Sequence, residues 1–211
     1  MLLSGQFNLL SFIILAVLLI VALCIHEASH AFSADRLGDG TPRYLGRLTL
    51  NPLAHLDPLG TVMLLLVGFG WGKPVPINPF NFKNYQRDSA LVALAGPASN
   101  IAMAIVAAVI VRLLPFENPT LYFIGSILIA FIRLNLLLGV FNLLPLGPLD
   151  GFKIVQGFLP SRLAAQWQQN ELMSLILLVV ILFLPINGTP VISFILNPII
   201  NVLFQILVGG S

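Results

Sequence analysis

The sequence predicts an all-α polytopic membrane protein. We expect a bundle of about five transmembrane helices, with a short β-hairpin or re-entrant segment between the first and the second. Hydrophobic residues make up 58 % of the 211 residues and charged residues only 9 %, and the mean hydropathy is +0.99. Soluble domains carry about 25 % charged residues. Long apolar segments also recur along the chain, which a soluble fold does not need.

Five apolar segments define the expected helices. They lie at about residues 9–34, 89–114, 121–144, 172–184 and 191–208. The first three exceed the roughly 20 residues that span a bilayer as a helix. The fourth is short for a span, and Asn197-Pro198 interrupts the fifth. These last two are expected to be thin, tilted or partly interfacial helices.

Residues 38–88 are expected to be more than a simple loop, since Gly, Pro and Asn punctuate them. Arg43 to Leu50 is strand-like, and its edge could pair with an extended substrate. Thr61 to Phe69 is apolar but too short to cross a membrane. Irregular backbone at membrane depth must be covered by protein or line a wet cavity. We therefore predict a hairpin or re-entrant piece that forms a wall of a substrate cleft.

The distribution of basic residues predicts the orientation in the membrane. Six Lys and Arg residues lie between the first and second segments, and two lie between the third and fourth. The positive-inside rule then places residues 35–88 and 151–171 in the cytoplasm and the N-terminus outside. The net charge of only +2 gives no indication of nucleic-acid binding. The single cysteine, Cys24, excludes an intramolecular disulfide.

A candidate metal site lies at the end of the first apolar segment. His26 and His30 are four residues apart, so they share one face of a helix and can bind one metal ion. Glu27 lies beside that face and can act as a general base on water. Burying two His and a Glu in an apolar helix is costly unless something compensates them, and a metal ion would do so.

A third protein ligand is expected, because catalytic zinc sites usually have three. Asp150 is the leading candidate, because it directly follows an apolar helix and a Pro- and Gly-containing stretch that can aim its carboxylate. The alternative is an Asp that only caps the next helix. The other candidates are His55 and the remaining acids, of which Glu117 falls on the wrong side of the membrane by the predicted topology.

At this point the chain resembles the site-2 intramembrane metalloproteases. The resemblance is carried by His26-Glu27-x-x-His30 together with Asn142-x-x-Pro145-x-x-x-Leu149-Asp150-Gly151. It implies zinc bound by His26, His30 and Asp150, with Glu27 as catalytic base. It also implies that Asn142 acts near the substrate carbonyl. Gly147 departs from the proline of many members, which affects the rigidity of the loop and not the chemistry.

Further stretches resemble the bacterial members, at residues 50–60, 72–76 and 95–100. Asn100 and His55 are candidate substrate-binding residues within them, although a structural turn is the favoured role for His55. The chain looks like a minimal member without PDZ or CBS domains. We expect one membrane-embedded domain over residues 1–211, with a catalytic core at about 9–155 and accessory helices at about 156–211.

The predicted function is hydrolysis of peptide bonds within or near a membrane. The expected partners are single-span membrane proteins as substrates and the lipid bilayer, in a bacterial inner or plasma membrane with the site toward the cytoplasm. Two rival functions are a zinc-binding membrane protein without catalysis and a metal transporter. Glu27 argues against the first, and the scarcity of polar residues on the other segments argues against the second. Arg133, in the middle of the third segment, is either functional or paired inside the bundle.

Overall fold

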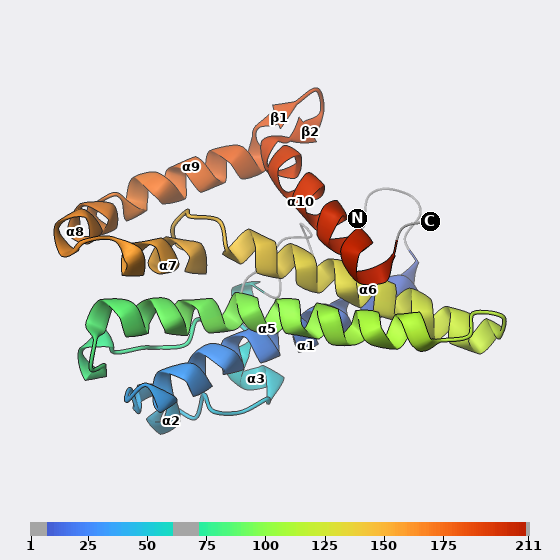
Figure 1. The fold of residues 1–211 in the computed structure, drawn as a ribbon, viewed down its shortest axis with the longest axis horizontal. Coiled ribbons are helices and arrows are strands. Elements are labelled where there is room, and N and C mark those ends of the chain that lie inside the picture. Colours follow the sequence, from blue (N-terminus) through green and yellow to red (C-terminus); the bar gives the residue numbers. More distant parts are fainter. Residues whose placement is uncertain (1–7, 61–71, 210–211) are drawn as a thin grey trace.

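The computed structural model describes residues 8–60 and 72–209, which are mostly helical (Figure 1). The four long helices are α1 (Leu9–Arg36), α5 (Tyr85–Leu113), α6 (Pro119–Asn142) and α10 (Val191–Val208). The shorter elements are α2 (Thr41–Tyr44), α3 (Pro52–His55), the 3-10 helix η1 (Pro79–Asn81), α7 (Asp150–Phe158), α8 (Ser161–Gln169), α9 (Glu171–Phe183) and the strands β1 (Pro185–Ile186) and β2 (Thr189–Pro190).

The four long helices are each long and apolar enough to cross a membrane. The pair α8 and α9, bent by 55°, makes a fifth candidate if the two count as one broken span. The predicted class, a polytopic helical membrane protein, is confirmed. α10 runs through Asn197-Pro198 without a break, whereas the sequence predicted an interruption there.

α5 begins at Tyr85, four residues before the predicted start, because polar residues cap it. The side chain of Asn84 accepts a hydrogen bond from the backbone of Arg87, and the carboxylate of Asp88 accepts one from the backbone of Asn84. Two free N–H groups at the helix start are satisfied in this way. The cap extends the helix beyond its apolar stretch, so an apolar pattern alone places the start too late.

α5 is a central helix of the fold, and it contacts α1, α6, α7 and α10. Its buried face toward α6 and α10 consists of small residues, Ala104, Ala107 and Ala108, which let the helices approach closely. Ile132 and Leu136 of α6 fill the space opposite them. This packing fixes α5 and α6 rigidly beside each other.

The predicted strand at Arg43 to Leu50 is wrong. Pro42 lies in the first turn of α2, where its fixed φ suits a helix and its missing N–H costs no hydrogen bond. Gly46 then takes a φ of +68°, which turns the chain instead of extending it. A substrate therefore has no edge strand to pair with in this segment.

In the segment of the sequence that connects α1 to α5, Leu56 and Gly72 form an antiparallel bridge. The N–H of Lys73 also donates to the carbonyl of His55 at 2.7 Å. The predicted re-entrant piece, Thr61 to Phe69, lies outside the described residues. A two-stranded hairpin formed by β1 and β2 lies farther along the chain, between α9 and α10.

Two buried charges hold the segment that follows α1. Asp39 is fully buried and accepts hydrogen bonds from Thr41, Asn78 and Asn81. Burial alone would raise the pKa of its carboxyl, but these hydrogen bonds lower that pKa below its ordinary value. Arg47 is also buried and donates to the backbone carbonyls of three residues, Ala54, Lys73 and Pro74. Residues 73 and 74 are thereby fixed in place.

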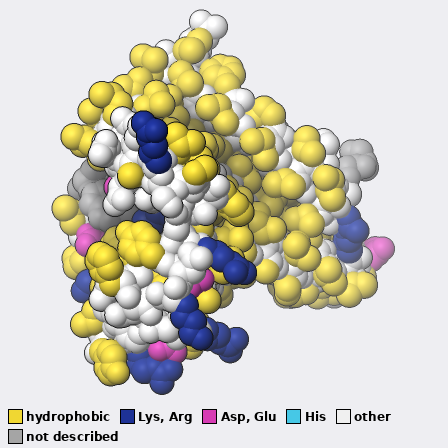
Figure 2. Space-filling view, turned by 60° about the vertical axis from the view of Figure 1, so that its left-hand side comes forward, with side chains coloured by type: hydrophobic (Ala, Val, Ile, Leu, Met, Phe, Trp, Pro, Cys, Tyr) yellow, Lys and Arg dark blue, Asp and Glu magenta, His cyan; other side chains and the backbone are white. Residues whose placement is uncertain are grey.

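Arg133 is an exposed residue of α6 that contacts α10. Its guanidinium lies over the ring of Phe204 from α10, 4.3 Å from the ring centroid. Such a cation–π contact stabilises a positive charge by about 0.5–2 kcal/mol. In the space-filling view most of the visible Lys and Arg side chains gather toward one end of the molecule, and hydrophobic side chains cover much of the rest (Figure 2). This separation of charged and apolar surface is typical of a protein embedded in a bilayer.

Candidate metal centre

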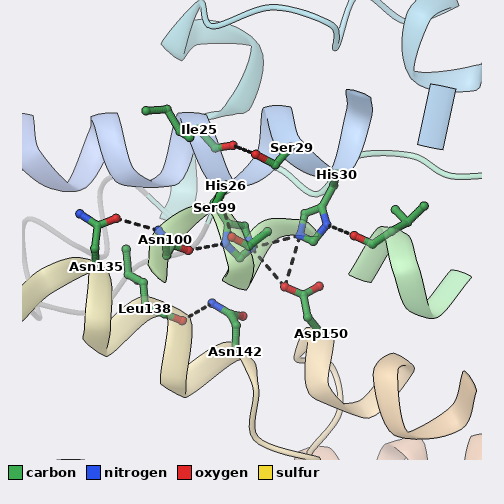
Figure 3. A network of polar contacts seen from close by, with 12 residues as sticks. Ile25, His26, Ser29, His30, Ser99, Asn100, Asn135, Leu138, Asn142 and Asp150 are labelled. Carbon is green, nitrogen blue, oxygen red and sulfur yellow. Dashed lines mark hydrogen bonds and ion pairs between the residues drawn. The ribbon is translucent and has the colours of Figure 1, made fainter. Parts of the chain in front are cut away.

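Three potential metal ligands meet between α1 and the start of α7 (Figure 3). The Nε2 atoms of His26 and His30 are 3.1 Å apart. The Oδ2 atom of Asp150 lies 3.2 Å from the first nitrogen and 3.3 Å from the second. The structure thus brings Asp150 next to the His26 and His30 pair, as the sequence predicted.

The outer nitrogens of both imidazoles are held by acceptors. His26 Nδ1 lies 2.6 Å from the side-chain oxygen of Asn100, and His30 Nδ1 lies 2.7 Å from the carbonyl oxygen of Val92. An oxygen of this kind can only accept, so each Nδ1 must carry the proton. Each Nε2 then presents a lone pair to the centre of the triangle, as a metal ligand must.

Asp150 is the first residue of α7, and the loop 143–149 leads to it. The loop folds tightly, because a Cβ on Gly151 would overlap the backbone of Leu143 and Leu144. Burial disfavours the ionised form of the Asp150 carboxyl, which therefore needs a compensating positive charge nearby. The start of a helix contributes part of that charge.

These three atoms fit a zinc ion. Tetrahedral zinc with bonds of about 2.0–2.1 Å keeps its ligand atoms about 3.3 Å apart, which matches the sides of the triangle. Asp150 Oδ2 is buried and has no hydrogen-bond partner among the described residues. Two nitrogen lone pairs and a carboxylate oxygen would repel one another without a cation between them. Three protein ligands also leave one coordination position for water or substrate.

Gly96 of α5 lies directly against the two imidazoles. A Cβ at this position would be 2.6 Å from His26 Nε2, which is far closer than carbon and nitrogen atoms can approach. The absence of a side chain at Gly96 lets the backbone of α5 pass beside the metal ligands. The sequence places Gly96 within a family-like stretch, but only the fold reveals this contact.

Gly96→Ala is expected to weaken zinc binding by about 10-fold or more, because the added methyl group must displace the imidazoles. Zinc affinity can be measured by competition with a chromophoric chelator. Gly139→Ala is a matched control, since it adds a methyl group to the neighbouring helix α6 with its closest contact to the flexible side chain of Ile101. Equal zinc affinity of Gly96→Ala and the unaltered protein would contradict this prediction.

A cavity of about 390 Å³ opens onto the three ligands. Glu27 and Asn142, the two predicted catalytic residues, both line it. Asn142 is the last residue of α6, and its side-chain nitrogen donates to the carbonyl of Leu138 at 3.0 Å. An amide nitrogen carries two hydrogens, and among the described residues Leu138 alone accepts from Asn142, which leaves one donor for another acceptor. The remaining lining residues are Pro74, Val75, Ile77, Pro79, Ser89, Val92, Ala93, Pro148 and Lys153.

The two candidate substrate-binding residues lie away from the cavity lining. Asn100 is fully buried behind His26. His55 is fully buried at the end of α3, where its Nε2 donates to the carbonyl of Thr49 at 2.8 Å. Among the described residues, His55 is not part of the metal-ligand cluster.

Sequence reasoning missed one polar residue near the site. Asn135 of α6 is fully buried, and its side-chain oxygen accepts a hydrogen bond of 3.0 Å from the amide nitrogen of Asn100 (Figure 3). A buried amide in an apolar helix is costly unless it is paired, and this cost is a signal that the sequence does contain.

Known proteins resemble this chain. The model of "Peptidase family M50" matches residues 117–184, which include Asn142 and Asp150 but not the two histidines. "Putative zinc metalloprotease YwhC" of Bacillus subtilis is 39 % identical over 192 residues, covering 89 % of this chain and 85 % of that protein. "Putative zinc metalloprotease Rip2" of Mycobacterium tuberculosis H37Rv is 34 % identical over 176 residues, or 80 % of this chain and 66 % of that protein.

A more distant relative is "Putative zinc metalloprotease MJ0611" of Methanocaldococcus jannaschii. It is 28 % identical over 156 residues, covering 72 % of this chain and 73 % of that protein. No solved structure matches the chain. The names of all three relatives agree with zinc as the metal that the ligand triangle fits.

Proposed function

The chain belongs to peptidase family M50, the site-2 protease family, and from this we propose that it cleaves peptide bonds inside or next to the membrane. The substrates would be transmembrane or membrane-proximal segments of single-span proteins. The main support for this proposal is that His26, His30 and Asp150 converge at one cavity that Glu27 also lines. Two of these ligands lie on α1, a helix able to span the membrane.

Each residue of the cavity has a role in the proposed hydrolysis. Zinc held by the three ligands supplies Lewis-acid activation of a water molecule and of the scissile carbonyl. Glu27 takes a proton from the attacking water and returns it to the leaving amine. The free donor of Asn142 stabilises the negative charge that develops on the carbonyl oxygen, and one such donor contributes about 3–4 kcal/mol.

The substrate must be locally unfolded to react. In an α-helix each carbonyl accepts a hydrogen bond from the residue four positions later, which shields it from attack. Segments of weak helix propensity are therefore the favoured targets. Pro74 and Val75, fixed by Arg47 through the carbonyls of residues 73 and 74, provide a rigid wall beside the unwound peptide.

The test is cleavage of a single-span reporter by the purified chain in lipid vesicles. We expect zinc-dependent fragments whose ends, determined by mass spectrometry, lie within or next to the reporter's apolar segment. A chelator should stop cleavage, and added zinc should restore it. Stoichiometric zinc without cleavage of any of several reporters would favour the rival function, a zinc-binding membrane protein without catalysis.

We further propose that residues 35–88 face the cytoplasm and that water reaches the site from that side. The basis is the basic residues of this stretch and the position of His30 near the end of α1. Single cysteines at the exposed positions Lys83 and Glu117, in a Cys24→Ala background, can be probed with an impermeant thiol reagent. Position 83 should label only from the cytoplasm and position 117 only from outside. The reverse pattern would invert the proposed topology.

A further inference from the structure

The two histidine ligands are held in different ways. His30 Nδ1 donates to a backbone carbonyl, that of Val92, which is present whatever the side chain at that position. His26 Nδ1 depends on the side chain of Asn100. An Asn side chain has a donor end and an acceptor end, and exchanging the two by a half-turn changes its shape very little. A reversed Asn100 would donate to His26 Nδ1 and force the proton onto Nε2, where the metal has to bind.

A second amide prevents this reversal. The nitrogen of Asn100 donates to the side-chain oxygen of Asn135 at 3.0 Å, and the nitrogen of Asn135 donates to the carbonyl of Phe131 at 2.9 Å. The Phe131 carbonyl can only accept, so the nitrogen of Asn135 must point toward it. The oxygen of Asn135 then faces Asn100 and can only accept from it. The carbonyl of Phe131 therefore sets the orientation of Asn135, and through it the orientation of Asn100.

Burial enforces these orientations of the two amide side chains. Both Asn100 and Asn135 are 0 % exposed, so water cannot replace a lost partner. A reversed Asn100 would bring two oxygens or two N–H groups face to face in a site without solvent, which is strongly unfavourable. The three residues come from three helices, α1, α5 and α6, so the packing of the bundle holds the relay in place (Figure 3).

We propose that Asn135 and Asn100 form an amide relay that fixes the Nδ1–H tautomer of His26 and so commits its Nε2 lone pair to the metal. Asn135 contacts neither metal nor substrate and is a positioning residue, as is Asn100. This inference rests on the proposed zinc centre and assigns Asn100 to the support of a ligand instead of to substrate binding.

The relay can be tested by measuring the zinc affinity of the full chain in detergent by chelator competition. Asn135→Leu should bind zinc about 10–100-fold more weakly, the usual cost of losing a residue that orients a ligand. Leu136→Ala is the matched control, because it removes a fully buried side chain from the adjacent position of the same helix. It should destabilise the protein in thermal unfolding but leave the zinc affinity unchanged.

A rescue experiment separates the relay from a merely structural role. In Asn135→Leu, the further change Asn100→Asp should restore most of the zinc affinity, because a carboxylate can only accept and holds the proton on His26 Nδ1 without help. The visible absorption of the cobalt-substituted protein should return to its original form in the double variant. For a purely structural role the second change would worsen binding.

Three results would be decisive against the relay or its premise. If Asn135→Leu folds and binds zinc as tightly as the unaltered chain, the relay has no role in metal binding. If Leu136→Ala loses zinc affinity to the same extent, the effect of Asn135 is one of packing alone. If the unaltered chain itself binds no zinc, the metal centre of the proposed function fails, and the relay fails with it.

Discussion

Glu27→Gln is expected to lower the rate of peptide cleavage by about 10²–10⁴-fold while the protein keeps its zinc. Glutamine is nearly isosteric with glutamate but cannot accept a proton from water. Glu27 is also absent from the triangle of ligand atoms, so its replacement removes no metal ligand. Metal content and reporter cleavage should be measured in the same preparation.

Glu117→Gln provides the matched control for this variant. It makes the same chemical change at an exposed residue in the connection between α5 and α6. Cleavage by Glu117→Gln should equal that of the unaltered chain. Loss of zinc from Glu27→Gln, or cleavage at the normal rate, would show that Glu27 does not act as the base.

Asp150→Ala is expected to have the second large effect, loss of both zinc and activity. Removing an outer partner of a ligand costs about 10–100-fold in metal affinity, so removal of a ligand itself should cost more than about 100-fold. Asp150→Asn should be nearly as damaging, since a neutral amide is a poorer zinc ligand than a carboxylate. Zinc affinity and cleavage of the reporter should fall together.

Asp35→Ala serves as the control for this second variant, because it removes an acid close to the end of α1 that pairs with Arg43 and not with the metal triangle. A surface ion pair of this kind contributes about 0–1 kcal/mol to stability, so zinc binding should persist. Stoichiometric zinc and full activity in Asp150→Ala would mean that another residue is the third ligand.

Much of the fold was predictable because local sequence patterns determine the long helices. The apolar segments predicted the long helices, and their ends agree to within a few residues except where a polar cap extends α5. The spacing of His26 and His30 predicted a shared helix face, because residues four apart always lie together on a helix. The approach of Asp150 to the two histidines was predictable, because a carboxylate that directly follows an apolar helix needs a partner.

The unpredicted features have two causes, a local turn signal that was read as a strand and contacts between distant parts of the chain. The strand expected after α1 failed because Pro42 and Gly46 favour a turn, whereas the apolar alternation of this segment reads as extended. The contacts of Asn135 and Gly96 become visible only when α1, α5 and α6 are packed together. Their roles arise from proximity to His26, which lies many residues earlier in the sequence.

A zinc ion bound by His26, His30 and Asp150, as proposed above, would also have a mechanical role. His30 lies near the end of α1, and Asp150 begins α7, which follows α5 and α6 in the sequence. A zinc ion between them is a cross-link that closes a loop of most of the catalytic core. Ligand binding to the folded state raises stability by about 2.7 kcal/mol at a free concentration 100 times the dissociation constant. Zinc supply should therefore govern the lifetime of this protein in the cell as well as its activity, with the metal-depleted chain being the more readily unfolded and degraded.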